Sequence, residues 1–311
     1  MKSFSDHMTY RLRLLLIGIA FVGVASFLVV SILYMGIFGK LFGKSADASV
    51  DASPSAVASS HQQDWAAYLT TIENVKVGSI MVDLGLKAVA PVTNKPNRLR
   101  VQIPMNTLDE NGLPSPQEFE ALNNVDESVS TALVEKTEAI YAGHLYHEGV
   151  MTLYYYAGED SRFDSVLSEA MSAFPNYKHG SQIDRDENWE FYRDFLYPLP
   201  IQLQSIGNQK TINIFAERGD KLDKERQVDH WIYFSTDQDR QKFLATIEGK
   251  GFKVEKQDVI EATDGRPFLL QISRFDKLTP AAADQYMLEL WQIAEDCNGN
   301  YDGWESHFVK E

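Results

Sequence analysis

The chain has 311 residues, and its 29 Lys and Arg against 44 Asp and Glu give a formal net charge of −15 at pH 7. This balance is a poor match for phosphate backbones, so we expect no nucleic-acid partner. The single cysteine, Cys297, excludes an internal disulfide framework and a cysteine-based zinc cluster, and its position at a predicted helix end favours a structural thiol.

A long uncharged run near the start of the chain predicts a membrane anchor. After a short tail, residues 1–13, the run extends from Leu14 to Gly39 without a charged side chain. A helix over residues 14–39 would be about 39 Å long, which is enough to cross a bilayer core of about 30 Å. We therefore expect a single-pass transmembrane helix that contacts the lipid bilayer, in a bacterial inner membrane.

Two alternatives to this anchor prediction stay open. A cleaved secretory signal would use the small residues around Ser45 and Ala48, although its apolar region is normally shorter, at about 7 to 15 residues. The flanking Lys and Arg residues differ by one between the two ends of the span, so the side of the soluble part is undecided.

Composition divides the rest of the chain. Residues 40–61 are rich in Ser and Ala and are expected to form a flexible linker. Residues 62–200 contain 10 Lys and Arg against 21 Asp and Glu, and residues 229–311 contain nine against 16. We expect two acidic α+β domains in these segments, joined by residues 201–228 as a connector that contains a strand.

The first acidic segment predicts an antiparallel sheet with helices on one face. Alternating apolar residues predict strands at residues 80–86 and 99–103, which we expect to pair, and further strands at residues 139–145, 150–157 and 177–183. Helices are expected after Ser115, whose Ser-Pro-Gln-Glu sequence forms a capping box, and around residues 163–174 and 188–197. The expected order is ββαββαβ, followed by the last helix.

The second acidic segment predicts a ferredoxin-like module. Strands are expected at residues 229–235, 252–261, 267–275 and 301–309, with helices that begin at Thr236 and Thr279. The order βαββαβ is that of a split-βαβ fold, in which the first and last strands are neighbours. Alternation directs Ile232, Phe234, Leu270 and Ile272 toward the helices, and leaves Trp231, Tyr233, Leu269 and Gln271 on the open face.

Two family resemblances rest on quoted motifs. The strand Asp-His-Trp-Ile-Tyr-Phe that begins at Asp229, with the Tyr-Asp-Gly-Trp run that begins at Tyr301, resembles the regulator of ribonuclease E activity B family. Residues 62–200 resemble the domain of unknown function 695, through Trp65, Tyr68 and the Asn-Trp-Glu-Phe-Tyr run that begins at Asn188. The first resemblance implies a non-catalytic acidic protein that regulates a ribonuclease by binding it.

Surface position predicts the residues that would contact a partner. We expect Trp231, Tyr233, Asp302 and Trp304 to form a partner-binding surface, because exposed aromatic residues beside acidic ones suit protein binding. The alternative, that the run from Tyr301 to Trp304 is a turn-and-packing signature, stays open.

No motif in the sequence supports catalysis. There is no Gly-rich phosphate loop, no Gly-x-Ser-x-Gly elbow and no metal motif with a full ligand set, so we expect no catalytic, cofactor-binding or metal-binding residue. The leading hypothesis is a membrane-anchored regulatory or protein-interaction protein. The alternatives are a small-ligand sensor or carrier that uses a cleft between the two domains, and a hydrolase built on His144, His147, His230 or His307.

Overall fold

The structure, a computed structural model, describes residues 61–72, 76–159, 162–262 and 264–310. The predicted tail, the predicted membrane span and the predicted linker up to residue 60 lie outside the described residues. No helix within the described ranges has both the length and the apolar character needed to cross a bilayer.

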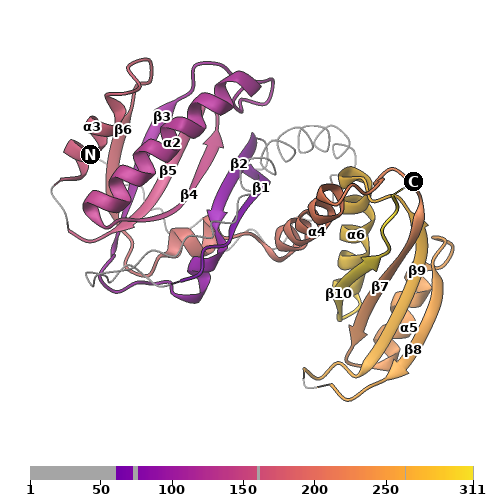
Figure 1. The fold of residues 1–311 in the computed structure, drawn as a ribbon. Helices are drawn as coiled ribbons and strands as arrows, with labels where there is room; N and C mark the ends of the chain where they lie inside the picture. The colour runs from indigo at the N-terminus through magenta and orange to yellow at the C-terminus, as the bar shows by residue number, and fades with distance from the viewer. Residues whose placement is uncertain (1–60, 73–75, 160–161, 263, 311) are drawn as a thin grey trace, which may run out of the picture. The chain divides into compact units, whose positions relative to one another are not determined.

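The first acidic segment forms a six-stranded antiparallel sheet with strand order β1-β2-β4-β5-β3-β6 (Figure 1). Its strands are β1 (Trp65–Ile72), β2 (Lys76–Asp83), β3 (Asn97–Pro104), β4 (Ile140–His147), β5 (Val150–Ala157) and β6 (Gly180–Arg185). Helix α2 (Pro116–Thr137) lies across one face of this sheet, and α3 (Phe163–Met171) packs beside it. The predicted antiparallel sheet is therefore confirmed, with the two α-helices α2 and α3 packed together.

The opposite face of this sheet is covered by an aromatic segment. Trp189, Tyr192 and Leu196 pack with residues of four strands in one buried core cluster. Trp189 stacks on Tyr156 of β5 with ring centroids 3.9 Å apart. The segment contains a π-helical turn, Tyr192–Leu196, instead of the regular helix predicted over residues 188–197. A 3-10 helix, Leu84–Ala88, contributes the buried Leu86 to the same cluster.

The predicted pairing of the strands at residues 80–86 and 99–103 is wrong. Strand β2 pairs with β1 and β4, whereas β3 pairs with β5 and β6. The prediction missed β1, whose Ala- and Thr-rich sequence gives only a weak alternation. Once β1 and β4 occupy both edges of β2, no edge remains for β3.

The connector at residues 201–228 is a helix for most of its length, and its last three residues belong to a strand. Helix α4 runs over Pro200–Glu217, and the next strand starts only at Arg226. Pro200 occupies the first helical turn, and the Leu199 amide donates to the Gln202 side chain at 2.8 Å, so both features favour a helix start. Ile212 and Phe215, three residues apart, bury one side of the helix.

The second acidic segment forms a four-stranded sheet with order β10-β7-β9-β8, as predicted for a ferredoxin-like module (Figure 1). Its elements are β7 (Arg226–Phe234), α5 (Asp237–Ile247), β8 (Lys253–Val259), β9 (Phe268–Asp276), α6 (Pro280–Asp296) and β10 (Gly299–Ser306). Ile232, Phe234, Leu270 and Ile272 pack against Phe243 of α5 and Leu290 of α6. The predicted assignment of the helix-facing side is confirmed.

Candidate functional site

The open face of the second sheet carries the two predicted aromatic residues of β7. Trp231 and Tyr233 alternate with the fully buried Ile232, so their rings lie on the side away from α5 and α6. Both residues are partly exposed. The neighbouring strand β10 pairs with β7 in antiparallel register, which brings its residues beside these rings.

An irregularity in β10 determines where Asp302 points. The pairing register shifts between Tyr301 and Gly303, so Asp302 is the extra residue of a β-bulge. Gly303 has φ +142°, a backbone conformation that a side chain would disfavour. A bulge turns its extra residue out of the regular alternation, and Asp302 is exposed to solvent.

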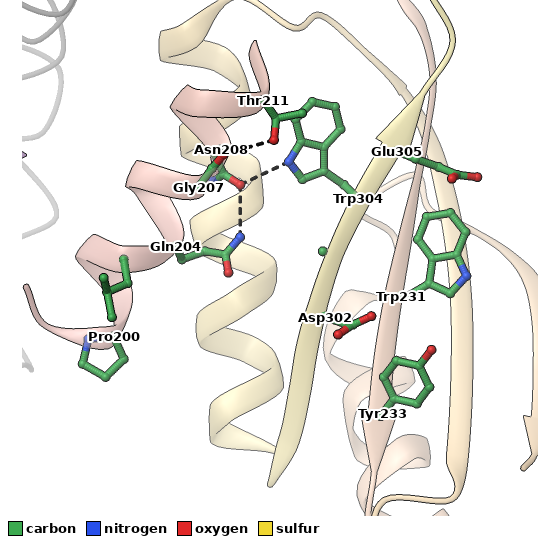
Figure 2. Close-up of a pocket in the computed structure, with 12 residues that line it drawn as sticks. Pro200, Gln204, Gly207, Asn208, Thr211, Trp231, Tyr233, Asp302, Trp304 and Glu305 are labelled. Atoms are coloured by element: carbon green, nitrogen blue, oxygen red, sulfur yellow. Dashed lines mark hydrogen bonds between the residues drawn. The ribbon is translucent and has the colours of Figure 1, made fainter. Parts of the chain in front are cut away.

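The four predicted residues line one open groove of about 760 Å³ (Figure 2). Trp231 and Tyr233 come from β7, whereas Asp302, Gly303, Trp304 and Glu305 come from β10. The opposite wall is formed by α4, with Pro200, Leu203, Gln204, Gly207, Asn208 and Thr211. The sequence pattern predicts a connector over this segment, so the α4 residues of the groove were not predicted. The Pro200 and Gln202 helix-start pattern was the signal that could have found them.

A hydrogen-bond network fixes Trp304 against α4. The indole Nε1 of Trp304 donates to Asn208 Oδ1 at 3.1 Å, and Gln204 Nε2 donates to the same oxygen at 3.0 Å (Figure 2). Asn208 Nδ2 donates in turn to Asp284 Oδ1 of α6 at 3.2 Å, and Ser205 Oγ donates to Asp284 Oδ2 at 2.7 Å. Burial raises the pKa of the Asp284 carboxyl, and these two donors counteract it.

The Tyr301–Trp304 run also has the alternative, packing role. Tyr301 is buried, and its hydroxyl lies 2.8 Å from His230 Nδ1. Trp304 packs against Phe215 of α4 with ring centroids 6.0 Å apart. Tyr301 and Trp304 therefore stabilise the module, whereas Asp302 between them faces solvent.

The electrostatic character of the groove is negative. Asp302 and Glu305 are both exposed, and neither makes an ion pair with any of the described residues. Glu305 lies opposite Asp229 in the β10–β7 register, which places two carboxylates side by side. Partial burial raises the pKa of Tyr233, and the negative charges of Asp302 and Asp264 raise it further.

The histidines considered for catalysis do not converge. His144 is buried against Asp126 of α2, with Nδ1 2.7 Å from the carboxylate, whereas His147 lies near the Val77 carbonyl at 3.2 Å. His230 is buried in the other sheet beside Tyr301, and His307 is exposed. Over the part of the chain that the structure describes, no group of three or more His, Cys, Asp or Glu side chains could hold a metal ion.

The single cysteine, Cys297, for which the sequence favours a structural role, is a buried residue that follows α6. It packs in the core cluster of the second module with Phe243 and Leu290. Burial raises the pKa of its thiol, which lowers the thiolate fraction at neutral pH. These surroundings are those of a structural thiol.

The fold defines the class of this protein: two successive α+β modules on antiparallel sheets, the second with ferredoxin-like strand order. Residues 63–197 match the model of a family of unknown function, DUF695. Residues 205–306 match the model described as Regulator of ribonuclease activity B. Both resemblances that the sequence indicated are thereby confirmed, and the second match includes all four predicted groove residues.

Two further comparisons add little. A search of curated proteins found no match. Among solved structures, the chain is similar to one described as the crystal structure of an unknown protein from Galdieria sulphuraria, with 10% sequence identity and a TM-score of 0.19. That similarity covers 68% of this chain and 99% of the other, and a TM-score this low supports no conclusion.

Proposed function

We propose that this chain is a membrane-anchored, non-enzymatic regulatory protein whose second module binds a protein partner and alters that partner's activity. The observation that carries the proposal is the match of residues 205–306 to a family of ribonuclease regulators. By this resemblance, the partner class is a ribonuclease. The first module would support or position the second, and the predicted span at residues 14–39 would hold both near a bilayer.

The groove supports binding better than catalysis. Its walls offer the aromatic surface of Trp231 and Tyr233 beside the exposed carboxylates of Asp302 and Glu305. Aromatic side chains are enriched at protein interfaces, where a few of them supply most of the binding energy. The groove is open to solvent on one side, which suits a segment of another protein.

A ribonuclease assay tests the regulatory proposal. The full chain in detergent micelles is added to ribonuclease E, the enzyme implied by the resemblance, and cleavage of a labelled RNA is followed with time. We expect slower cleavage, with the inhibition weakened by Trp231→Ala. Cleavage at an unchanged rate with the chain in stoichiometric excess over the nuclease would overturn the proposal.

The anchor has its own test. The full chain should remain with the bacterial inner membrane after washing with high salt and carbonate, because a transmembrane helix is retained by lipid and not by charge. A mature chain that begins near Asp47 in the soluble fraction would contradict the anchor. A reporter fused after Glu311 then locates the modules, since a position outside the cytoplasm would exclude direct control of a cytoplasmic ribonuclease.

A further inference from the structure

We propose that the groove between α4 and β10 recognises a basic, extended segment of the partner protein, with arginine side chains that reach Asp302 and Glu305. This inference rests on the proposed protein-binding function and specifies the chemistry of the partner. It follows from three features of the groove: its unmatched negative charge, its aromatic side wall and its free strand edge.

The first feature is negative charge without an internal counterion. Elsewhere on the same sheet, Glu255 pairs with Lys253 at 2.8 Å and Asp258 pairs with Lys256 at 3.1 Å. Within the described residues, Asp302 and Glu305 have no such lysine or arginine partner. Exposed carboxylates without a counterion attract cations, so the groove favours a basic partner.

Asp229 adds to this charge at the centre of the sheet. Its carboxylate accepts hydrogen bonds from Gln227 and Gln271, which are neutral donors, at 3.1 and 3.4 Å. Its negative charge therefore remains uncompensated beside Glu305, its partner in the strand register. An acidic peptide or a nucleic acid would be repelled at this position.

The second feature is the aromatic wall. Trp231 and Tyr233 project from β7 beside Asp302 and Glu305 (Figure 2). A guanidinium group can stack on an aromatic face while it donates hydrogen bonds to a carboxylate, and its aliphatic stem covers apolar surface. Arginine uses both contacts at once, whereas the compact ammonium group of lysine lacks the planar stacking surface. The groove therefore favours arginine over lysine.

The third feature is the shape of the groove. Strand β10 is the last strand of its sheet and pairs only with β7, so its other edge has no strand neighbour among the described residues. Helix α4 stands opposite this edge, tied to it through the hydrogen bond between Trp304 and Asn208. A free strand edge with side-chain sites next to it is the arrangement that binds an extended polypeptide by strand addition. Alternate arginines of that segment would face Asp302 and Glu305.

A direct binding measurement tests this inference. The probe is a fluorescein-labelled peptide in which arginine alternates with valine, titrated into the full chain in neutral detergent micelles and followed by fluorescence anisotropy. Matched peptides replace each arginine with lysine, citrulline or glutamate. We expect the arginine peptide to bind tightest, the lysine peptide more weakly, the citrulline peptide about fivefold to twentyfold more weakly than the arginine peptide, and the glutamate peptide not measurably. Affinity should fall as salt rises, because these charges are exposed.

Charge-matched variants localise the binding. Asp302→Asn combined with Glu305→Gln should weaken the arginine peptide about fivefold to twentyfold, the sum of two exposed ion pairs. The control combines Glu248→Gln with Glu295→Gln, which removes two exposed carboxylates from the helix layer of the same module and should leave affinity unchanged. Both double variants should unfold at the same urea concentration as the original chain, since all four residues are exposed.

Several results would overturn the inference. These are no binding of the arginine peptide, equal binding of the citrulline peptide, or equal weakening by both double variants. A change in oligomeric state on mutation of Asp302 and Glu305, measured by sedimentation, would assign the groove to a second copy of the chain. If ribonuclease inhibition persists in the groove variant, the basic-segment inference fails alone, whereas absence of inhibition by the original chain defeats the proposed function.

Discussion

The Asn208 side chain joins α4, α6 and β10, and its removal should destabilise the second module strongly. Asn208 is only 2% exposed and makes three side-chain hydrogen bonds, to Trp304, Gln204 and Asp284. In Asn208→Ala the indole N–H of Trp304 loses its acceptor, and the partly buried carboxylate of Asp284 loses one of its two donors. Buried hydrogen bonds contribute about 1 kcal/mol each, and more when an ionised group is involved, so we expect a loss of about 3 kcal/mol.

The assay is urea unfolding of the full chain in detergent, followed by tryptophan fluorescence. With a slope of about 1 to 3 kcal/mol per molar urea, a loss of about 3 kcal/mol lowers the midpoint by about 1 to 3 M. The matched control is Asn213→Ala on the same helix, where the lost contact is one bond from Gln209, one helical turn away, at 2.8 Å. Both substitutions change helix propensity equally. Similar midpoints for the two variants would refute the network as the link between α4 and β10.

Two other predictions concern buried charge. Arg226 Nη1 donates to both Asp220 carboxylate oxygens at 2.7 Å, and both side chains are fully buried. Asp220→Asn should therefore lower the free energy of unfolding by about 3 to 5 kcal/mol. A loss below about 1 kcal/mol in urea unfolding would contradict this. Burial, with a smaller effect of Arg274, lowers the pKa of His230 from 6.5 to about 3. The unfolded chain therefore binds more protons between these values, so stability from His230 is complete above about pH 6.5 and is lost as pH falls toward 3. His230→Gln should flatten the decline in melting temperature over that range, and an unchanged pH profile would show that His230 does not cause it.

Local sequence patterns were sufficient to predict the strands and sheet faces of the second module, but they did not predict the strand pairing of the first sheet. The strict alternation of Ile232 and Phe234 with Trp231 and Tyr233 determined both the β7 strand and its two faces, because one face had to be buried. The pairing partners of β2 were not predicted correctly. Apolar alternation identifies a strand but does not indicate which strand it pairs with. Strand β1, whose alternation is weak, pairs with β2 at the edge where β3 was predicted to pair.

The same contrast holds for the candidate site. Trp231, Tyr233, Asp302 and Trp304 were predicted as surface residues, and the structure brings all four to one groove. The opposite wall required α4, whose polar Gln204, Asn208 and Thr211 read as connector residues in the sequence. Their side chains acquire a role only when Trp304 and Asp284, far away in the chain, supply hydrogen-bond partners.

The sequence by itself determined the acidic charge, the uncharged run at residues 14–39, the division into two α+β segments and the ferredoxin-like order of the second. These features follow from composition and from the periodic pattern of apolar residues within short segments, and neither depends on residues far away in the chain. Only the tertiary structure decided the strand order of the first sheet and the wall that α4 builds opposite β10. Those features depend on contacts between residues far apart in the chain, and the stability of such contacts comes from burial and hydrogen bonding that local sequence does not encode.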